Sequence, residues 1–140
     1  MCAERICAGI RAKDYVSEAL AIYYFVLEHT RYARDPALQE RVIAPRLVVE
    51  QWLQKRKPSL DCDDLAALIC ALCMSMGCKV RVVTVAFTNM MHAGERQYSH
   101  VFAQVQEPRT GTWIVLDPVA PGNADTMLSK AVAAKIWSIS

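Results

Sequence analysis

Cys62, His100 and Asp117 are three side chains whose types and order along the chain could carry out acyl transfer through a thiol. In such chemistry a cysteine attacks a carbonyl carbon and a histidine takes and returns the proton. A carboxylate holds the histidine ring in one tautomer and stabilises its charged form. Whether the three side chains meet depends on the elements that carry them.

Cys62 lies at the start of the clearest predicted helix, which runs from about Asp61 to Gly77. Asp61 is a good N-cap residue, and Asp64 stands three residues later, where an acid also supports a helix start. The free N–H groups and the dipole of a first turn favour a thiolate and could bind an oxyanion. The acids Asp61, Asp63 and Asp64 oppose a thiolate, so Cys62 needs a positively charged histidine beside it.

His100 and Asp117 lie on two predicted strands, Tyr98 to Gln106 and Thr112 to Val119. Side chains alternate along a strand, so His100 shares one face of its strand with Phe102. The stretch between the strands has turn chemistry, with a glycine suited to a left-handed backbone position. The two strands are therefore expected to form an antiparallel hairpin.

The length of the hairpin loop decides how His100 and Asp117 are placed. If the two residues after Glu107 form the loop, His100 directly faces Asp117. If the loop covers residues 108–111, Phe102 faces Asp117 and His100 lies diagonally beside it on the same face. Only a loop of odd length separates the two side chains, so both even registers predict a histidine–carboxylate pair.

The remaining segments predict an α+β fold, with a helical N-terminal half packed on a small antiparallel sheet. Apolar residues at steps of three and four indicate helices, and a valine-rich run indicates a strand. Tyr23 and its aromatic neighbours Tyr24 and Phe25 are interpreted as core and helix packing. The expected elements are helices at Lys13–Tyr32 and Pro45–Lys55, a strand at Lys79–Thr88, a loop at Asn89–Gln97 and a short helix at Asp125–Trp137.

Composition favours a globular protein of one domain over residues 1–140. Apolar residues make up 54% and charged residues 21%, and the net charge of +2 argues against a nucleic-acid surface. No stretch reaches the roughly 18 apolar residues of a membrane span, and the N-terminus has no apolar region typical of a secretory signal. We therefore expect a cytoplasmic protein with reduced thiols, no nucleic-acid partner and no membrane partner.

Two patterns could suggest a metal, and neither is persuasive. Cys70 and Cys73 have a zinc-ligand spacing, but they lie among leucines inside a helix, and no second pair completes a site. The acidic cluster next to Cys62 is followed by helix core rather than by the glycine-containing loop of a calcium site. No metal and no cofactor is expected.

These features together resemble the transglutaminase-like cysteine superfamily, which has its cysteine at the start of a central helix and its histidine and aspartate on consecutive antiparallel strands. The resemblance implies a transglutaminase-like (papain-like) core with Cys62, His100 and Asp117 as the catalytic residues. The matching pieces are Asp61–Ala66, Met76–Val83, Ser99–Phe102 and Trp113–Pro118.

Upstream, Tyr32 to Pro36 with Glu40 and Pro45 resembles the compact versions encoded in bacteriophage genomes. Such a protein would act in the host cytoplasm or in the virion. The family's side-chain donor to the oxyanion has three candidates, which are Gln51, Trp52 and Tyr32.

The resemblance and the residues favour cysteine-dependent acyl transfer on an amide or peptide bond, by hydrolysis or transamidation, with a protein or peptide as substrate. The alternative is a catalytically silent relative that acts as a structural or binding protein, as in a phage particle. A papain-like peptidase of separate lineage would differ in the order of its elements and usually carries asparagine as the third residue.

Overall fold

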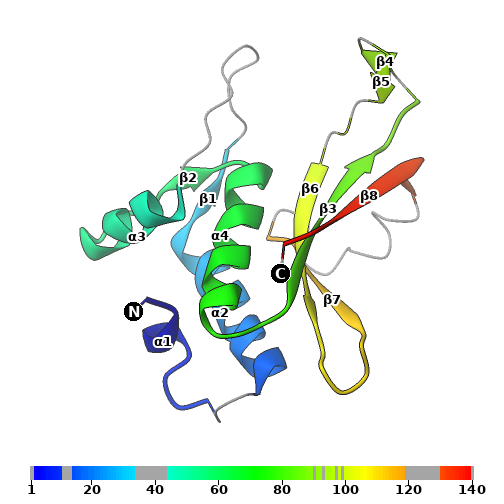
Figure 1. Cartoon of the computed structure of the whole chain (residues 1–140). Helices are drawn as coiled ribbons and strands as arrows, with labels where there is room; N and C mark the ends of the chain where they lie inside the picture. Colours follow the sequence, from blue (N-terminus) through cyan, green and yellow to red (C-terminus); the bar gives the residue numbers. More distant parts are fainter. Residues whose placement is uncertain are drawn as a thin grey trace.

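Helices form one layer of the protein and a four-stranded antiparallel sheet forms the other (Figure 1). This is the predicted α+β class. The computed structural model describes residues 2–10, 14–33, 44–89, 91–92, 94–96, 98, 100–118 and 130–139. The helices are α1 (Cys2–Ile6), α2 (Tyr15–His29), α3 (Pro45–Leu53) and α4 (Cys62–Ser75), and the sheet has the order β7 (Trp113–Leu116), β6 (His100–Gln106), β3 (Val80–Ala86), β8 (Ala133–Ser138).

The helix α2 is shorter than predicted because its two ends are capped within the expected range. The side chain of Asp14 accepts a hydrogen bond from the N–H of Ser17 at the first turn. At the other end the hydroxyl of Thr30 donates to the carbonyl of Val26, 2.7 Å away. The chain then extends, and Arg31–Tyr32, predicted as helix, forms the short strand β1 beside β2 (Ser59–Leu60).

The central helix α4 carries the largest part of the core. Its buried side chains include Leu65, Leu68 and Ile69, which are at most 2% exposed. They pack between the sheet strands β3 and β6 on one side and the helices α1, α2 and α3 on the other. Each such leucine or isoleucine stabilises the fold by about 1.5–3 kcal/mol. The start of α4 is therefore fixed relative to the sheet.

The C-terminal end of α4 is a Schellman motif. Gly77 has φ +89°, and its N–H donates to the carbonyl of Met74 while the N–H of Cys78 donates to the carbonyl of Cys73. This motif turns the chain sharply back toward the sheet. The side chains of Cys73 and Cys78 both lie in the core, at 0% and 5% exposure.

The hairpin of β6 and β7 has the four-residue loop, which confirms the second of the two predicted registers. Gln106 pairs with Trp113, and the N–H of Glu107 donates to the carbonyl of Thr112. At the other end of the ladder, Ala103 pairs with Leu116. One step further along, Phe102 stands opposite Asp117, and His100 lies diagonally beside it.

The prediction of a helix over Asp125–Trp137 is wrong from Ala131 onward, whereas Lys130 is helical. Ala133–Ser138 is the strand β8, which pairs antiparallel with β3 from Ala133 opposite Ala86 to Ser138 opposite Arg81. The free edge of β3 supplies the hydrogen bonds that this segment would otherwise make within a helix, and pairing outweighs local helix propensity. Residues 125–129 lie outside the described part.

Two smaller differences concern segments near the chain start and after β3. The helix α1 was not predicted, and it packs against α2 and α4. The expected loop at Asn89–Gln97 contains a short hairpin of β4 (Met91–His92) and β5 (Glu95–Arg96) with Gly94 between them at φ +82°. None of the described helices has the length and apolarity that a membrane span requires.

Candidate active site

Cys62 is the first residue of α4, as its sequence context predicts. The side chain of Asp61 accepts from the N–H of Asp64 at 3.0 Å, and the side chain of Asp64 accepts from the N–H of Asp61 at 3.3 Å. This reciprocal capping box fixes the direction of the first turn. Cys62 itself is partly buried, whereas Cys70 and Cys73 further along the helix are fully buried.

His100 and Asp117 meet, as both even hairpin registers predict. Nε2 of His100 lies 2.6 Å from Oδ2 of Asp117. The two side chains are only 11% and 2% exposed, so the contact is shielded from water. Because an ionised carboxylate can only accept, Nε2–H donates and Nδ1 is the ring nitrogen left for another partner.

The pKa of His100 reflects its two neighbouring side chains, Asp117 and Cys62. Burial lowers the pKa, but hydrogen bonds to the side chains of Asp117 and Cys62, together with their negative charges, outweigh burial and raise the pKa to about 9. His100 therefore interacts with Cys62 as well as with Asp117. At neutral pH its ring is positively charged, which is the partner that a thiolate beside three aspartates requires.

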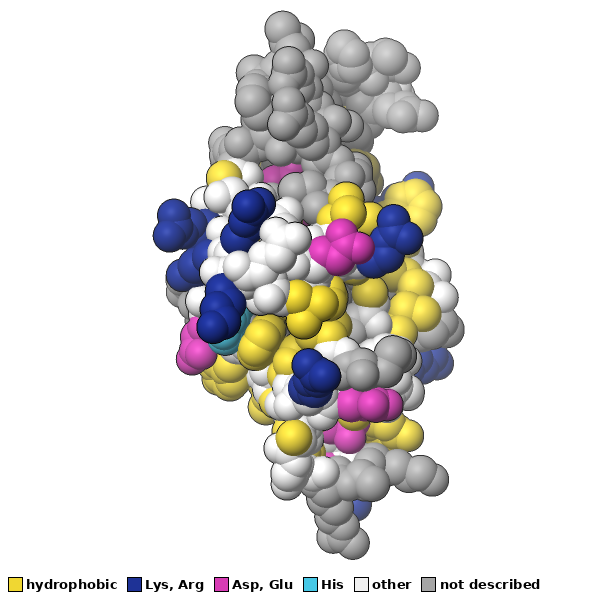
Figure 2. Space-filling view, turned by 90° about the vertical axis from the view of Figure 1, so that its left-hand side faces the viewer, with side chains coloured by type: hydrophobic (Ala, Val, Ile, Leu, Met, Phe, Trp, Pro, Cys, Tyr) yellow, Lys and Arg dark blue, Asp and Glu magenta, His cyan; other side chains and the backbone are white. Residues whose placement is uncertain are grey.

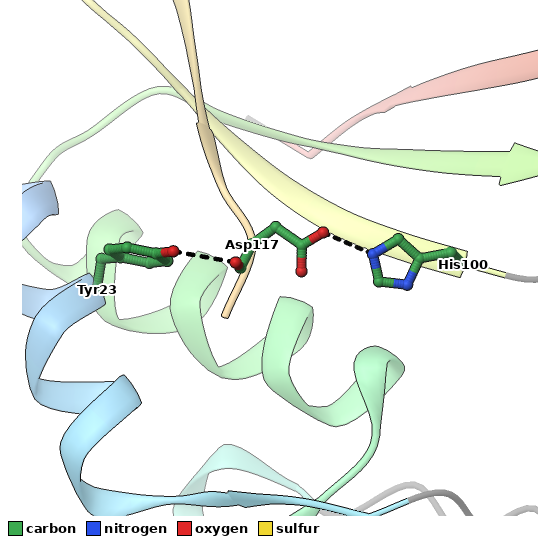
Figure 3. A network of polar contacts seen from close by, with 3 residues as sticks. All are labelled: Tyr23, His100 and Asp117. Atoms are coloured by element: carbon green, nitrogen blue, oxygen red, sulfur yellow. Dashed lines mark hydrogen bonds and ion pairs between the residues drawn. The ribbon is translucent and has the colours of Figure 1, made fainter. Parts of the chain in front are cut away.

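Tyr23 adds a contact that sequence reasoning missed. Its hydroxyl donates to the main-chain carbonyl of Asp117 at 3.0 Å. Figure 3 shows Tyr23 of α2, Asp117 after β7 and His100 on β6 as one chain of contacts. The helical periodicity placed Tyr23 in the core correctly. A buried tyrosine needs a partner for its hydroxyl, and that requirement was the available signal.

The three candidates for a side-chain donor to the oxyanion are now distinguishable. Nε1–H of Trp52 donates to the carbonyl of His29 at 2.9 Å, so Trp52 has a structural partner and is a poor candidate. Gln51 lies on the same helix, α3. Tyr32 pairs with Leu60 across β1 and β2, two residues before Cys62. The register thus places only Tyr32 on the strand beside the segment that leads into Cys62.

Trp52 instead lines a groove of about 610 Å³ formed by α1, α2 and α3. Figure 2 shows this face, on which apolar side chains gather at the centre with Lys and Arg side chains around them. The residues lining the groove are Cys2, Arg5, Ile6, Phe25, Val49, Trp52 and Leu53. The groove includes neither Cys62, His100 nor Asp117, so it is separate from the candidate active site.

In the part of the chain that the structure describes, no group of three or more His, Cys, Asp or Glu side chains could hold a metal ion. Cys70 and Cys73 are buried among leucines of α4. Burial raises the pKa of Cys70 to about 11, which keeps its thiol protonated at neutral pH.

The sequence pattern of the Transglutaminase-like superfamily matches residues 2–118, a range that includes Cys62, His100 and Asp117. No curated protein is significantly similar in sequence.

Two solved structures share the fold. A candidate protease from Parabacteroides distasonis superposes with a TM-score of 0.63 at 11% identity, over 83% of this chain and 22% of that protein. A candidate cysteine protease from Cytophaga hutchinsonii superposes with a TM-score of 0.55 at 16% identity, over 99% of this chain and 45% of that protein. The chain thus spans less than half the length of either protein, and at these identities the likeness concerns the fold alone.

Proposed function

Because the chain belongs to the transglutaminase-like superfamily, we propose that it is a cysteine enzyme that transfers the acyl group of an amide or peptide bond to water or to an amine. The observation that carries the proposal is the contact of 2.6 Å between His100 and Asp117, with His100 also interacting with the thiol of Cys62. Both similar structures are candidate proteases, and one of them a cysteine protease, which supports a thiol mechanism.

In the first half-reaction Sγ of Cys62 attacks the carbonyl carbon of the substrate. The C–N bond breaks, a thioester forms, and the proton of His100 goes to the leaving amine. The negative charge of Asp117 keeps the charged imidazole stable before that transfer. A pKa of about 9 means that His100 holds the required proton at neutral pH.

In the second half-reaction neutral His100 takes a proton from water or from an acceptor amine. The oxygen or nitrogen attacks the thioester carbon, the C–S bond breaks, and the thiolate of Cys62 leaves. Water gives a carboxylic acid and an amine gives a new amide. His100 is again protonated at the end of the cycle, so no external reactant besides the acceptor is needed.

The oxyanion of each tetrahedral intermediate would bind at the start of α4, where main-chain N–H groups and the helix dipole favour negative charge. Tyr32 is the proposed side-chain donor, because the pairing of β1 with β2 places it beside Leu60. The N–H of Ala33 also donates to the carbonyl of Leu60 at 2.9 Å, which fixes this pairing next to Cys62.

Iodoacetamide labelling between pH 5 and pH 9 tests the proposal, with mass spectrometry to locate each adduct. Cys2 is the internal reference because it is partly buried, like Cys62. Burial raises the pKa of Cys2 although the N-terminus and Arg5 oppose this effect, so Cys2 should react slowly below pH 7. We expect Cys62 to react at least about tenfold faster than Cys2 at pH 6.5, because imidazolium favours the thiolate.

His100→Ala should abolish this selectivity, and Cys2→Ser should leave the labelling of Cys62 unchanged. If Cys62 of the wild type labels no faster than Cys2, the enzymatic proposal fails, and the silent structural or binding relative becomes the better description. Casein offered with and without a biotin-linked alkylamine then separates hydrolysis from transamidation, because only transamidation attaches biotin to the protein.

We also propose a protein or peptide substrate, a cytoplasmic location, one domain over residues 1–140 and a compact form of the kind encoded by bacteriophages. The compact spacing from Cys62 through His100 to Asp117 supports the last of these. The upstream stretch that resembles the phage versions runs through residues 34–40, which lie outside the described part of the chain.

A further inference from the structure

We propose that Tyr23 is a positioning residue of the active site, which holds Asp117 in place through its main chain and thereby sets the orientation of His100. This inference rests on the proposed function and adds to it a residue from a different layer of the fold. Tyr23 lies on α2, 94 positions before Asp117, and its hydroxyl donates to the carbonyl of Asp117 at 3.0 Å. Figure 3 shows the ring of Tyr23 directed at that carbonyl.

The position of Asp117 explains why such a contact matters. The pairing of β7 with β6 ends at Leu116, one residue earlier. The next residue is Pro118, which has no N–H to contribute to a ladder. The main chain of Asp117 thus lies at the very end of its strand, where a hydrogen bond from the helical layer adds a restraint that the β6–β7 pairing does not provide.

Burial strengthens the hydrogen bond from Tyr23 to Asp117. Tyr23 is 9% exposed and Asp117 is 3% exposed, so water competes little for either group. Burial raises the pKa of the Tyr23 phenol, and the charges of Asp117 and Tyr24 add to this effect. The hydroxyl therefore stays protonated at every pH at which the enzyme could work, and it remains a donor.

Loss of this donor would act on the reacting groups indirectly. The carboxylate of Asp117 must lie within 2.6 Å of Nε2 of His100 to hold the ring and its charge. Small displacements of a catalytic group cost rate out of proportion to their size. A shift at the end of β7 would lengthen this contact, turn the imidazole away from Cys62 and lower the pKa of His100.

The chain offers a matched control in the adjacent residue. Tyr24 is also a tyrosine of α2, with its ring centroid 5.5 Å from that of Tyr23, but it is 58% exposed. Tyr23→Phe and Tyr24→Phe each remove one hydroxyl from the same helix. A general effect on α2 would appear in both variants, whereas an effect through Asp117 would appear only in Tyr23→Phe.

The experiment measures the pH dependence of Cys62 alkylation by iodoacetamide in the whole chain, together with kcat and KM for casein. We expect Tyr23→Phe to slow alkylation at pH 7 and kcat by about tenfold each, with KM unchanged, and to move the alkaline fall of kcat to lower pH. Tyr24→Phe should match the wild type. The residue p-aminophenylalanine, incorporated in place of Tyr23, keeps a neutral donor and should restore both the rate and the pH profile.

Gly77→Ala serves as a control for stability alone, because it strains the other end of α4 without touching the site. An equal loss of rate in Gly77→Ala would overturn the proposal, as would wild-type kinetics in Tyr23→Phe. The failure of p-aminophenylalanine to restore the rate would also overturn it, and this variant decides the matter if Tyr23→Phe does not fold. If the wild type shows no selective reactivity at Cys62, the proposed function has failed, which is a different result.

Discussion

The two ends of α4 carry the same residue type in opposite environments. At the start, Cys62 is partly buried beside the charged ring of His100. At the end, Cys73 is 0% exposed, and its hydrogen bond to Cys78 and its burial raise its pKa far above the ordinary value. Both thiols belong to one rigid helix, so the difference arises from what surrounds each end.

The local sequence already separates the two ends. The start has aspartates that cap the helix, and polar groups there keep the first turn at the edge of the core. The end has Gly77, which turns the chain back so that Cys78 covers Cys73. A helix start leaves N–H groups available for anions, whereas the Schellman motif pairs the carbonyls of Cys73 and Met74 with main-chain N–H groups. The proposed function therefore attributes the reactivity of Cys62 to its position at the start of the helix.

Cys62→Ala is the substitution with the largest expected effect, because it removes the nucleophile. We expect a loss of kcat of at least about 10³-fold with little change in the free energy of unfolding. Steady-state kinetics and urea denaturation measure the two quantities. Cys73→Ala, the same change at the other end, should instead leave kcat near the wild type and lower stability. Comparable losses of activity in both variants would remove the distinction between the two ends.

Asp117→Asn is expected to lower kcat by about 100-fold, because the amide no longer stabilises the charged ring of His100. The hydrogen bond and the charge of Asp117 both raise the pKa of His100. The alkaline fall of kcat, which we expect near pH 9 in the wild type, should therefore move to lower pH in the variant. An unchanged alkaline limb would show that another group titrates there.

The sequence predicted the local placement of the candidate site residues better than the long-range contacts that support them. The position of Cys62 at a helix start and the contact of His100 with Asp117 were predicted because helix capping and strand alternation are local rules that act over a few residues. The contact of Tyr23 with Asp117 joins residues 94 positions apart, and no local rule reaches that far. The strand β8 was mistaken for a helix for the same reason, since its structure depends on the free edge of β3.

Cys73→Ser places a hydroxyl in the core at the closed end of α4. Because Cys73 is 0% exposed, a serine there loses its contacts with water, and we expect the free energy of unfolding to fall by about 1–3 kcal/mol. Chemical denaturation measures the change. Cys2→Ser is the control, since Cys2 is partly buried near the surface and should tolerate a hydroxyl. Equal effects at both positions would argue that Cys73 is less enclosed than the structure shows.

Gly77→Ala tests the turn that closes this end. Gly77 has φ +89°, which an L-residue with a side chain rarely adopts, and among the residues that the structure describes the new methyl group would meet Tyr15 alone, at ordinary contact distance. Backbone strain alone should therefore lower the free energy of unfolding by about 1–2 kcal/mol. Gly77→Asn should cost less, because asparagine tolerates the left-handed region better. A larger loss for asparagine than for alanine would point to crowding instead of strain.

The smallest expected effect is a change in the free energy of unfolding with pH. It distinguishes the two ends of α4, because the groups at each end lose their contribution in a different pH range. The pKa of His100 is raised from 6.5 to about 9 by folding, so its contribution is complete below pH 6.5 and is lost as the pH rises through 9. The pKa of Cys70, toward the closed end, is raised by burial from 9.0 to about 11, so its contribution is lost between those values. Urea denaturation from pH 6 to pH 11 should show both declines in the wild type. His100→Ala should remove the lower decline alone. Cys70→Ala should reduce the upper decline without removing it, because the hydrogen bond to Cys78 and burial also raise the pKa of Cys73. A single decline common to both variants would mean that the ends are not independent.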